Sequence, residues 1–332
     1  MLKLTRPARY LALALLVIGI AAVPLLLTGS DARYVLKVLT FVGINVMIVT
    51  GLALLHGYAG QISLGHAAFF GIGAYSSAYV MTRLEWPWIA GLLVAAALSA
   101  GGGVLLALPS LRLKGHYLAM ATLGFGEIMR IAFVEAQGIT GGPDGLSGVP
   151  YASVGGFEFS TPQLNYWLVW GTVAIVMWIS SNIVRGRPGR SMLAVQGSEL
   201  GAMASGVGVT GLKVRVFTIS AAFAGIAGAL YASVVGFISP SSFSLHFSTI
   251  LVAMAVLGGT RSLFGPALAA ALLTLVPYAD AVLPGLSREA LSFIQDWEAD
   301  LYGLTIILVL LLAPGGVAAL IRRVAGKRGD RP

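Results

Sequence analysis

The sequence predicts an all-α fold: a polytopic membrane helical bundle of about ten membrane segments, with both termini in the cytoplasm. Three observations lead to this prediction. Of the 332 residues, 57% are hydrophobic and only 10% are charged, whereas about a quarter of the residues of soluble domains are charged. The hydrophobic residues are gathered into uncharged runs, and a helix needs about 20 apolar residues to cross a bilayer. The basic residues lie mostly at the edges of these runs, where they fix orientation.

The first predicted span covers residues 10–28, shortly after Lys3, Arg6 and Arg9. A secretory signal peptide has the same polarity. This apolar run, however, is longer than a signal core and lacks a clear small-x-small cleavage site, which favours an uncleaved helix. The same length rule places further spans near residues 36–55, 62–82, 88–109, 116–136, 163–184 and 214–236.

Residues 248–279 form either one long tilted helix or two short ones, and charge decides between them. The last span, near residues 301–321, runs into Arg322 and Arg323, so its end is cytoplasmic. The start of the chain is cytoplasmic as well, so the number of crossings must be even. Glycine and proline within residues 258–266 mark a turn, and dividing the region there gives about ten crossings. The external loops of this topology are residues 137–162 and 280–300.

A polar stretch, residues 185–213, separates two apolar spans and begins with three arginines, which place it in the cytoplasm. Residues 191–205 have helix-forming composition, and Gly206 and Gly208 follow as stop signals. Two interpretations stay open. The stretch is either a docking helix for a soluble partner or a plain connector.

Three positions of this stretch, Glu199, Ala202 and Gly206, resemble the Glu-Ala-Ala-x-x-x-Gly coupling loop of ABC-importer permeases. Gly201 stands where that family has its first alanine, and Glu199 falls one residue early. The resemblance implies an ATPase-coupling loop that runs from Ser191 to Gly206.

Two longer stretches are similar to the branched-chain amino acid permease family in particular. They are residues 57–75, which begin Gly-Tyr-Ala-Gly-Gln-Ile-Ser-Leu-Gly-His, and residues 113–128, which are followed by Gly-Gly-Pro-Asp-Gly-Leu at 141–146. The resemblance covers most of the chain. It implies one ABC-importer transmembrane permease domain over residues 1–322 and a basic cytoplasmic tail at residues 323–332.

The resemblance also implies the rest of a transport machine in the bacterial cytoplasmic (inner) membrane. The implied partners are two ABC ATPase subunits, a second related permease that forms a heterodimer with this chain, an external substrate-binding protein and the surrounding lipid bilayer. The implied substrates are leucine, isoleucine and valine. Relatives of similar pattern carry urea or short amides, so these substrates stay open. A different class, an ion-coupled secondary carrier, needs ionisable groups within its spans.

Enzyme classes find little support in the sequence. There is no Gly-x-x-x-x-Gly-Lys-Ser/Thr phosphate loop, so ATP hydrolysis must come from a partner chain. No cysteine is present, and His56, His66, His116 and His246 show no metal-binding spacing, so no metal site or cofactor is expected. The net charge of +8 lies at span edges rather than in a patch, which does not favour nucleic acid as a partner.

Polar residues inside predicted spans are candidates for the translocation path. Glu127 and Arg130 lie three residues apart on one helix face at membrane depth. Glycines before Gln61 and Ser63 break a helix and leave an amide and a hydroxyl beside irregular backbone. Asn45 lies in the span before them. For each of these residues the alternative is structural: a neutralising ion pair, a tight turn, or a single interhelical hydrogen bond.

Overall fold

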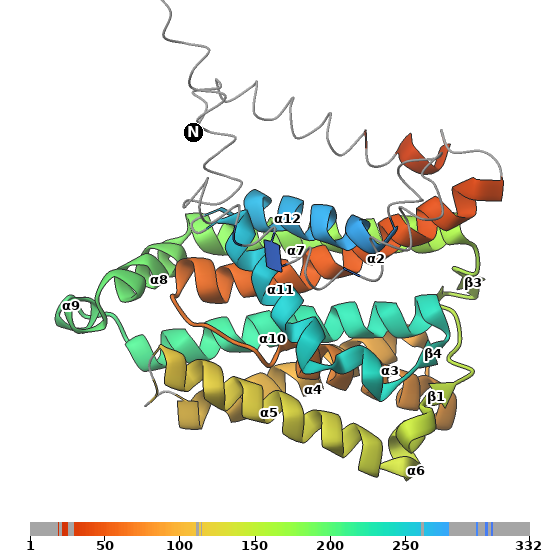
Figure 1. Ribbon diagram of the computed structural model, residues 1–332, viewed down its shortest axis with the longest axis horizontal. Coiled ribbons are helices and arrows are strands. Elements are labelled where there is room, and N and C mark those ends of the chain that lie inside the picture. The colour runs from red at the N-terminus through yellow and green to blue at the C-terminus, as the bar shows by residue number, and fades with distance from the viewer. Residues whose placement is uncertain are drawn as a thin grey trace, which may run out of the picture.

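The computed structural model describes residues 19, 22–25, 30–110, 113, 115–259, 262–278, 297, 303, 304 and 307. Most of the predicted first span, last span and loop 280–300, and the whole basic tail at 323–332, lie outside the described residues. The rest is a bundle of helices whose long members run side by side (Figure 1). These long helices are α2 (Ser30–Leu52), α3 (His66–Arg83), α4 (Trp88–Ser110), α5 (His116–Glu135), α7 (Pro162–Arg185) and α10 (Val209–Val235).

Five helices of the described part are long and apolar enough to cross a membrane. They are Ala32–Tyr58, Trp88–Pro109, His116–Glu135, Pro162–Arg185 and Val209–Val235. This finding confirms the predicted all-α membrane bundle. The sequence also predicts a span near residues 62–82, but α3 is not in this group.

Short elements occupy the two ends of the bundle. At one end lie α8 (Arg187–Gly197) and α9 (Glu199–Ala204), between α7 and α10 (Figure 1). At the other end lie α6 (Gln137–Thr140), η2 (Gly142–Asp144) and four two-residue strands. Strand β1 (Leu146–Ser147) pairs antiparallel with β4 (Phe237–Ile238), and β2 (Ser153–Val154) with β3 (Phe157–Glu158).

The division of residues 248–279 into two segments is confirmed. After the short η3 (Pro240–Phe243), α11 runs over Leu245–Gly258 and α12 over Phe264–Leu275, followed by η4 (Val276–Tyr278). The division falls within the turn that the sequence predicts. Gly259 follows the last residue of α11 and takes a φ of +89°. Both short helices pack against each other and against α2.

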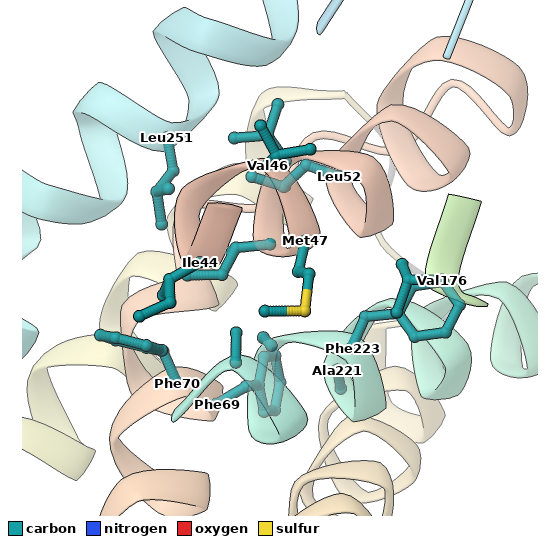
Figure 2. Close-up of a cluster of buried hydrophobic side chains, with 14 of the residues drawn as sticks. Ile44, Val46, Met47, Leu52, Phe69, Phe70, Val176, Ala221, Phe223 and Leu251 are labelled. Atoms are coloured by element: carbon teal, nitrogen blue, oxygen red, sulfur yellow. The ribbon is translucent and has the colours of Figure 1, made fainter. Parts of the chain in front are cut away.

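The core forms where α2, α3, α4 and α10 meet. Figure 2 shows Met47 of α2 pointing toward Phe69 of α3 and Ala221 of α10, all of them fully buried. Helices α3 and α10 approach so closely that a Cβ added at Gly228 would lie 2.1 Å from the carbonyl oxygen of Phe70. Small residues at membrane helix contacts permit such an approach.

Candidate functional site

The irregular segment between α2 and α3 enters the bundle instead of closing a turn at its end. Helix α2 continues into a π-helical turn, η1 (Ala53–Tyr58), and Gly60 then takes a φ of +68°, which favours glycine. Residues 59–65 are not helical. We refer to residues 59–65 as the break.

Other helices satisfy the polar backbone groups of the break and of the first turn of α3. The amide of Leu64 donates to Thr122 Oγ1 of α5 at 2.9 Å, and the amide of Ala67 donates to Ser248 Oγ of α11 at 3.1 Å. Irregular backbone at membrane depth is stable only where protein or water satisfies it. Side chains from two distant helices therefore hold this segment in place.

His66, the first residue of α3, is fully buried at the centre of the same network. Its Nδ1 lies 3.0 Å from Ser63 Oγ, and its Nε2 lies 2.7 Å from Ser220 Oγ of α10. Ser220 lies about 16 Å along α10 from its first residue, at 1.5 Å per residue. Helix α3 therefore begins well inside the bundle, several residues later than the predicted start at residue 62.

The predicted pair on α5 forms and faces outward. Glu127 Oε1 accepts hydrogen bonds from Nε and Nη2 of Arg130, the first at 2.9 Å. The two side chains are 41% and 39% exposed. They share the outer side of α5 with exposed apolar residues, and we call this surface the α5 outer face. Its other members are Tyr117, Met120, Ile128 and Ile131.

The outward surfaces of α4 and α7 differ from the α5 outer face, because, among the described residues, they carry no ion pair, and their large exposed side chains are apolar. Along α4 the large exposed side chains are apolar, and they are Ile89, Leu93, Leu98, Leu105 and Leu108. In the middle of α7 they are again apolar, and they are Trp167, Ile175 and Trp178. Such surfaces suit lipid chains. The α5 outer face, in contrast, exposes a carboxylate and a guanidinium midway along its helix.

The break contacts α5 close to the position of the ion pair, because Gly126 precedes Glu127 directly and lies one turn before Arg130. A Cβ added at Gly65 would lie 2.6 Å from the Thr122 carbonyl oxygen, and one added at Gly126 would lie 3.6 Å from Gly65 Cα. The inner side of α5 therefore rests on the break, directly next to Glu127 in sequence. A movement of the break would therefore displace α5, the helix that carries Glu127 and Arg130.

The structure encloses the remaining predicted path residues. Ser63 is 1% exposed, and Gln61 is 7% exposed with no hydrogen-bond partner for its Oε1 among the described residues. Asn45 lies apart from both and donates from Nδ2 to Thr274 Oγ1 at 2.9 Å. Asn45 borders a cavity of about 250 Å³, together with Phe41, Phe70 and Tyr231. The predicted path residues thus do not converge on one surface.

The single helix predicted over residues 191–205 is wrong, because the structure has two helices there. Helix α8 contains Ser191 and ends at Gly197. Ser198 then takes extended backbone, and its Oγ accepts from the Gly201 amide at 3.1 Å, which caps the start of α9. A sharp corner therefore separates Ser191 from the other predicted coupling residues.

Two of those coupling residues face their own chain. Ala202 is 3% exposed and packs in a small cluster with Val195 of α8 and Val209 of α10. Glu199 forms an ion pair with Lys213 of α10, between Oε1 and Nζ. Gly206 has a φ of +79° in the turn after α9, with open space around it. The exposed side of α9 therefore belongs to other residues.

Leu200 and Met203 form that exposed side, and the sequence prediction did not include them. They are 73% and 50% exposed, on successive turns of α9. Two apolar residues three apart within a polar stretch were the signal that could have identified them. We call these two residues the α9 knob.

The described part of the chain is a bundle of membrane-length helices with an irregular segment held inside it, which is the architecture of a helical membrane protein. The chain belongs to the family described as "Branched-chain amino acid transport system / permease component", whose model matches residues 34–311.

The chain is similar to several named transport proteins. It is 32% identical to the high-affinity branched-chain amino acid transport system permease protein LivM of Salmonella typhimurium, over 93% of this chain and 75% of the relative. It is 32% identical to LivM of Escherichia coli, over 88% and 71%. It is also 29% identical to the D-allose transport system permease protein AlsC of Escherichia coli, over 61% and 60%. No solved structure matches the chain.

Proposed function

We propose that the chain is the membrane-spanning permease subunit of an ATP-driven importer of branched-chain amino acids. The observation that carries this proposal is the 32% identity to LivM over 93% of the chain. The sequence has no phosphate loop of its own. Energy therefore comes from two partner ATPases, and substrate is delivered by an external binding protein.

In this proposal the translocation path of the substrate runs along the α5 outer face, and a second, related permease contacts the chain there. Ionisable side chains are expensive in contact with lipid and normally face protein or water. Glu127 and Arg130 are paired yet partly exposed, whereas the middles of α4 and α7 present apolar side chains. Both patterns are explained if lipid contacts α4 and α7 and if α5 lies at a hydrated boundary between the two permease subunits. Gln61 and Ser63 lie enclosed in the break, and Ser63 connects the break to His66 of α3.

Both termini lie in the cytoplasm, together with α8 and α9, and the chain crosses the membrane about ten times. Arg185, Arg187 and Arg190 support this orientation for the α8–α9 end. The α9 knob then faces the ATPases, and the paired strands at the opposite end face the binding protein.

Cysteine labelling tests the orientation, because the sequence contains no cysteine. Ser160 follows β3 and Ser205 follows α9, two elements at opposite ends of the bundle (Figure 1), and both serines are exposed. In intact cells, Ser160→Cys is expected to react with an impermeant maleimide and Ser205→Cys only after permeabilisation. The reversed pattern would overturn the orientation.

Uptake of labelled substrate tests the function. The chain is expressed with its companion ATPases, second permease and binding protein in cells that lack branched-chain amino acid carriers. Uptake of leucine, isoleucine and valine is expected, with loss of uptake when ATP is depleted while the ion gradient is maintained. Uptake of urea or short amides instead would replace the substrate class. Uptake that follows the ion gradient would identify a secondary carrier.

A further inference from the structure

We propose that Lys213 is a positioning residue for energy coupling, because its ion pair with Glu199 transmits displacement of α9 to α10. This inference rests on the proposed function. It differs from the role that the coupling-loop resemblance implies, in which Glu199 contacts an ATPase directly. Here the carboxylate is a link within the permease, and the α9 knob is the part that the ATPase touches.

The pair is a protected contact rather than a surface one. The Lys213 side chain is 6% exposed and the Glu199 side chain 26% exposed, and Nζ lies 2.5 Å from Oε1. Surface ion pairs contribute little. Removing one partner of a largely enclosed pair, in contrast, leaves a charge without its counterion in a poorly solvated place. The ammonium of Lys213 therefore needs the carboxylate, and α9 cannot move away from α10 without breaking the contact.

The backbone on both sides of α9 is poorly suited to transmit force. Ser198 makes an extended corner before the helix, and Gly206 and Gly208 lie in the turn after it. Beyond the ion pair, a small apolar cluster around Ala202 ties α9 to its neighbours. Without the ion pair, a push on the α9 knob would reach α10 through this small cluster and through the two corners alone.

From Lys213 the body of α10 leads to Ser220, and side-chain contacts lead from Ser220 to the break. Lys213 and Ser220 are seven residues apart, two turns along the same face of α10. Ser220 contacts His66 at 2.7 Å, and His66 begins α3 and contacts Ser63 of the break. The break lies against the inner side of α5, whose outer face carries the ion pair proposed to line the path. Displacement of α10 along its axis would therefore act on the break directly.

A charge-swap experiment separates the two roles of Glu199. In the complete transporter reconstituted in vesicles, Glu199→Lys and Lys213→Glu are each expected to lower leucine transport per ATP hydrolysed by at least about tenfold, at the upper end of effects on coupled networks. The double variant restores the pair in reverse and is expected to recover transport to within about threefold of the original protein. A double variant as inactive as Glu199→Lys would show that the carboxylate acts on the ATPase instead, and would overturn the proposal.

A matched control and a second readout exclude a merely structural role. Arg215 lies on α10 one half-turn from Lys213 and is exposed. Arg215→Met is expected to leave transport per ATP unchanged, whereas Lys213→Met lowers it while ATPase binding and the amount of permease in the membrane stay normal. Equal losses of transport and ATP hydrolysis in Lys213→Met would contradict the coupling role.

The pair can also be tested without transport, so that failure of the proposed function is distinguishable from failure of this inference. In the purified chain, a thermal double-mutant cycle with Glu199→Gln and Lys213→Met is expected to give non-additive shifts in Tm. Additive shifts would show that the two side chains are not coupled and would refute the link. If the original transporter carries no branched-chain amino acid while the cycle is non-additive, the substrate assignment fails and the link stands.

Discussion

Replacing Leu200 and Met203 together by glutamate is expected to release the ATPases from the permease and to abolish transport. Both side chains are exposed and apolar, and they lie on one side of α9. Anchor residues that fill a partner's pocket typically contribute about 2 kcal/mol or more each, so losing one raises Kd about 30-fold. An unpaired carboxylate in such a pocket adds a desolvation cost. Co-purification of ATPase with tagged permease measures the effect.

The control for the knob variant is at the other end of the molecule. Phe157 in β3 is 55% exposed, comparable to the two knob residues. Phe157→Glu makes the same chemical change there and is expected to leave ATPase co-purification intact. Normal ATPase recovery with the double knob variant would exclude α9 as the docking helix.

Replacing Gly228 by leucine is expected to prevent the permease from folding. The added Cβ alone would lie 2.1 Å from the Phe70 carbonyl oxygen and 2.7 Å from the Ala74 amide nitrogen. Both contacts are with backbone, so α3 and α10 must move apart as whole helices. Overpacking a core costs about 1–3 kcal/mol even where side chains can adjust. We therefore expect little monodisperse protein after detergent extraction, measured by size-exclusion chromatography.

The same helix provides a matched control for this substitution. Gly211 lies in the first turn of α10, and an added Cβ there meets nothing within 4 Å. Gly211→Leu is expected to yield monodisperse protein in normal amount. A normal yield and normal Tm for Gly228→Leu would show that the close crossing of α3 and α10 is not required.

The spans that the sequence predicted well are those whose ends carry local signals. For α7 the prediction was residues 163–184 and the structure has Pro162–Arg185, because Thr161 caps a helix that starts with proline. The division of residues 248–279 followed from charge balance and from glycine and proline at the turn. The boundary of α7 is thus set within a few residues, whereas the division also needed the charges at the two ends of the chain.

The start of α3 could not be read from local sequence. Residues 62–65 precede α3 without a local stop signal. The Leu64 amide contacts Thr122 of α5, and the first residues of α3, His66 and Ala67, contact Ser220 and Ser248 in later helices. The corner at Ser198 is different, because a serine followed by glutamate is a helix-start signal that the single-helix prediction ignored. The partner of Glu199 lies 14 residues away in another helix, and no local pattern identifies it.

The enclosure of α3 has a consequence for biogenesis. Thirteen of its 18 residues are buried, including His66, and the helix is absent from those apolar enough to cross a membrane. When this segment leaves the ribosome, the serines that satisfy it at residues 220 and 248 have not yet been synthesised. Backbone groups without partners cost several kcal/mol each in hydrocarbon. We therefore expect the start of α3, where Ala67 contacts Ser248 and His66 contacts Ser220, to reach its final place only once α10 and α11 are present.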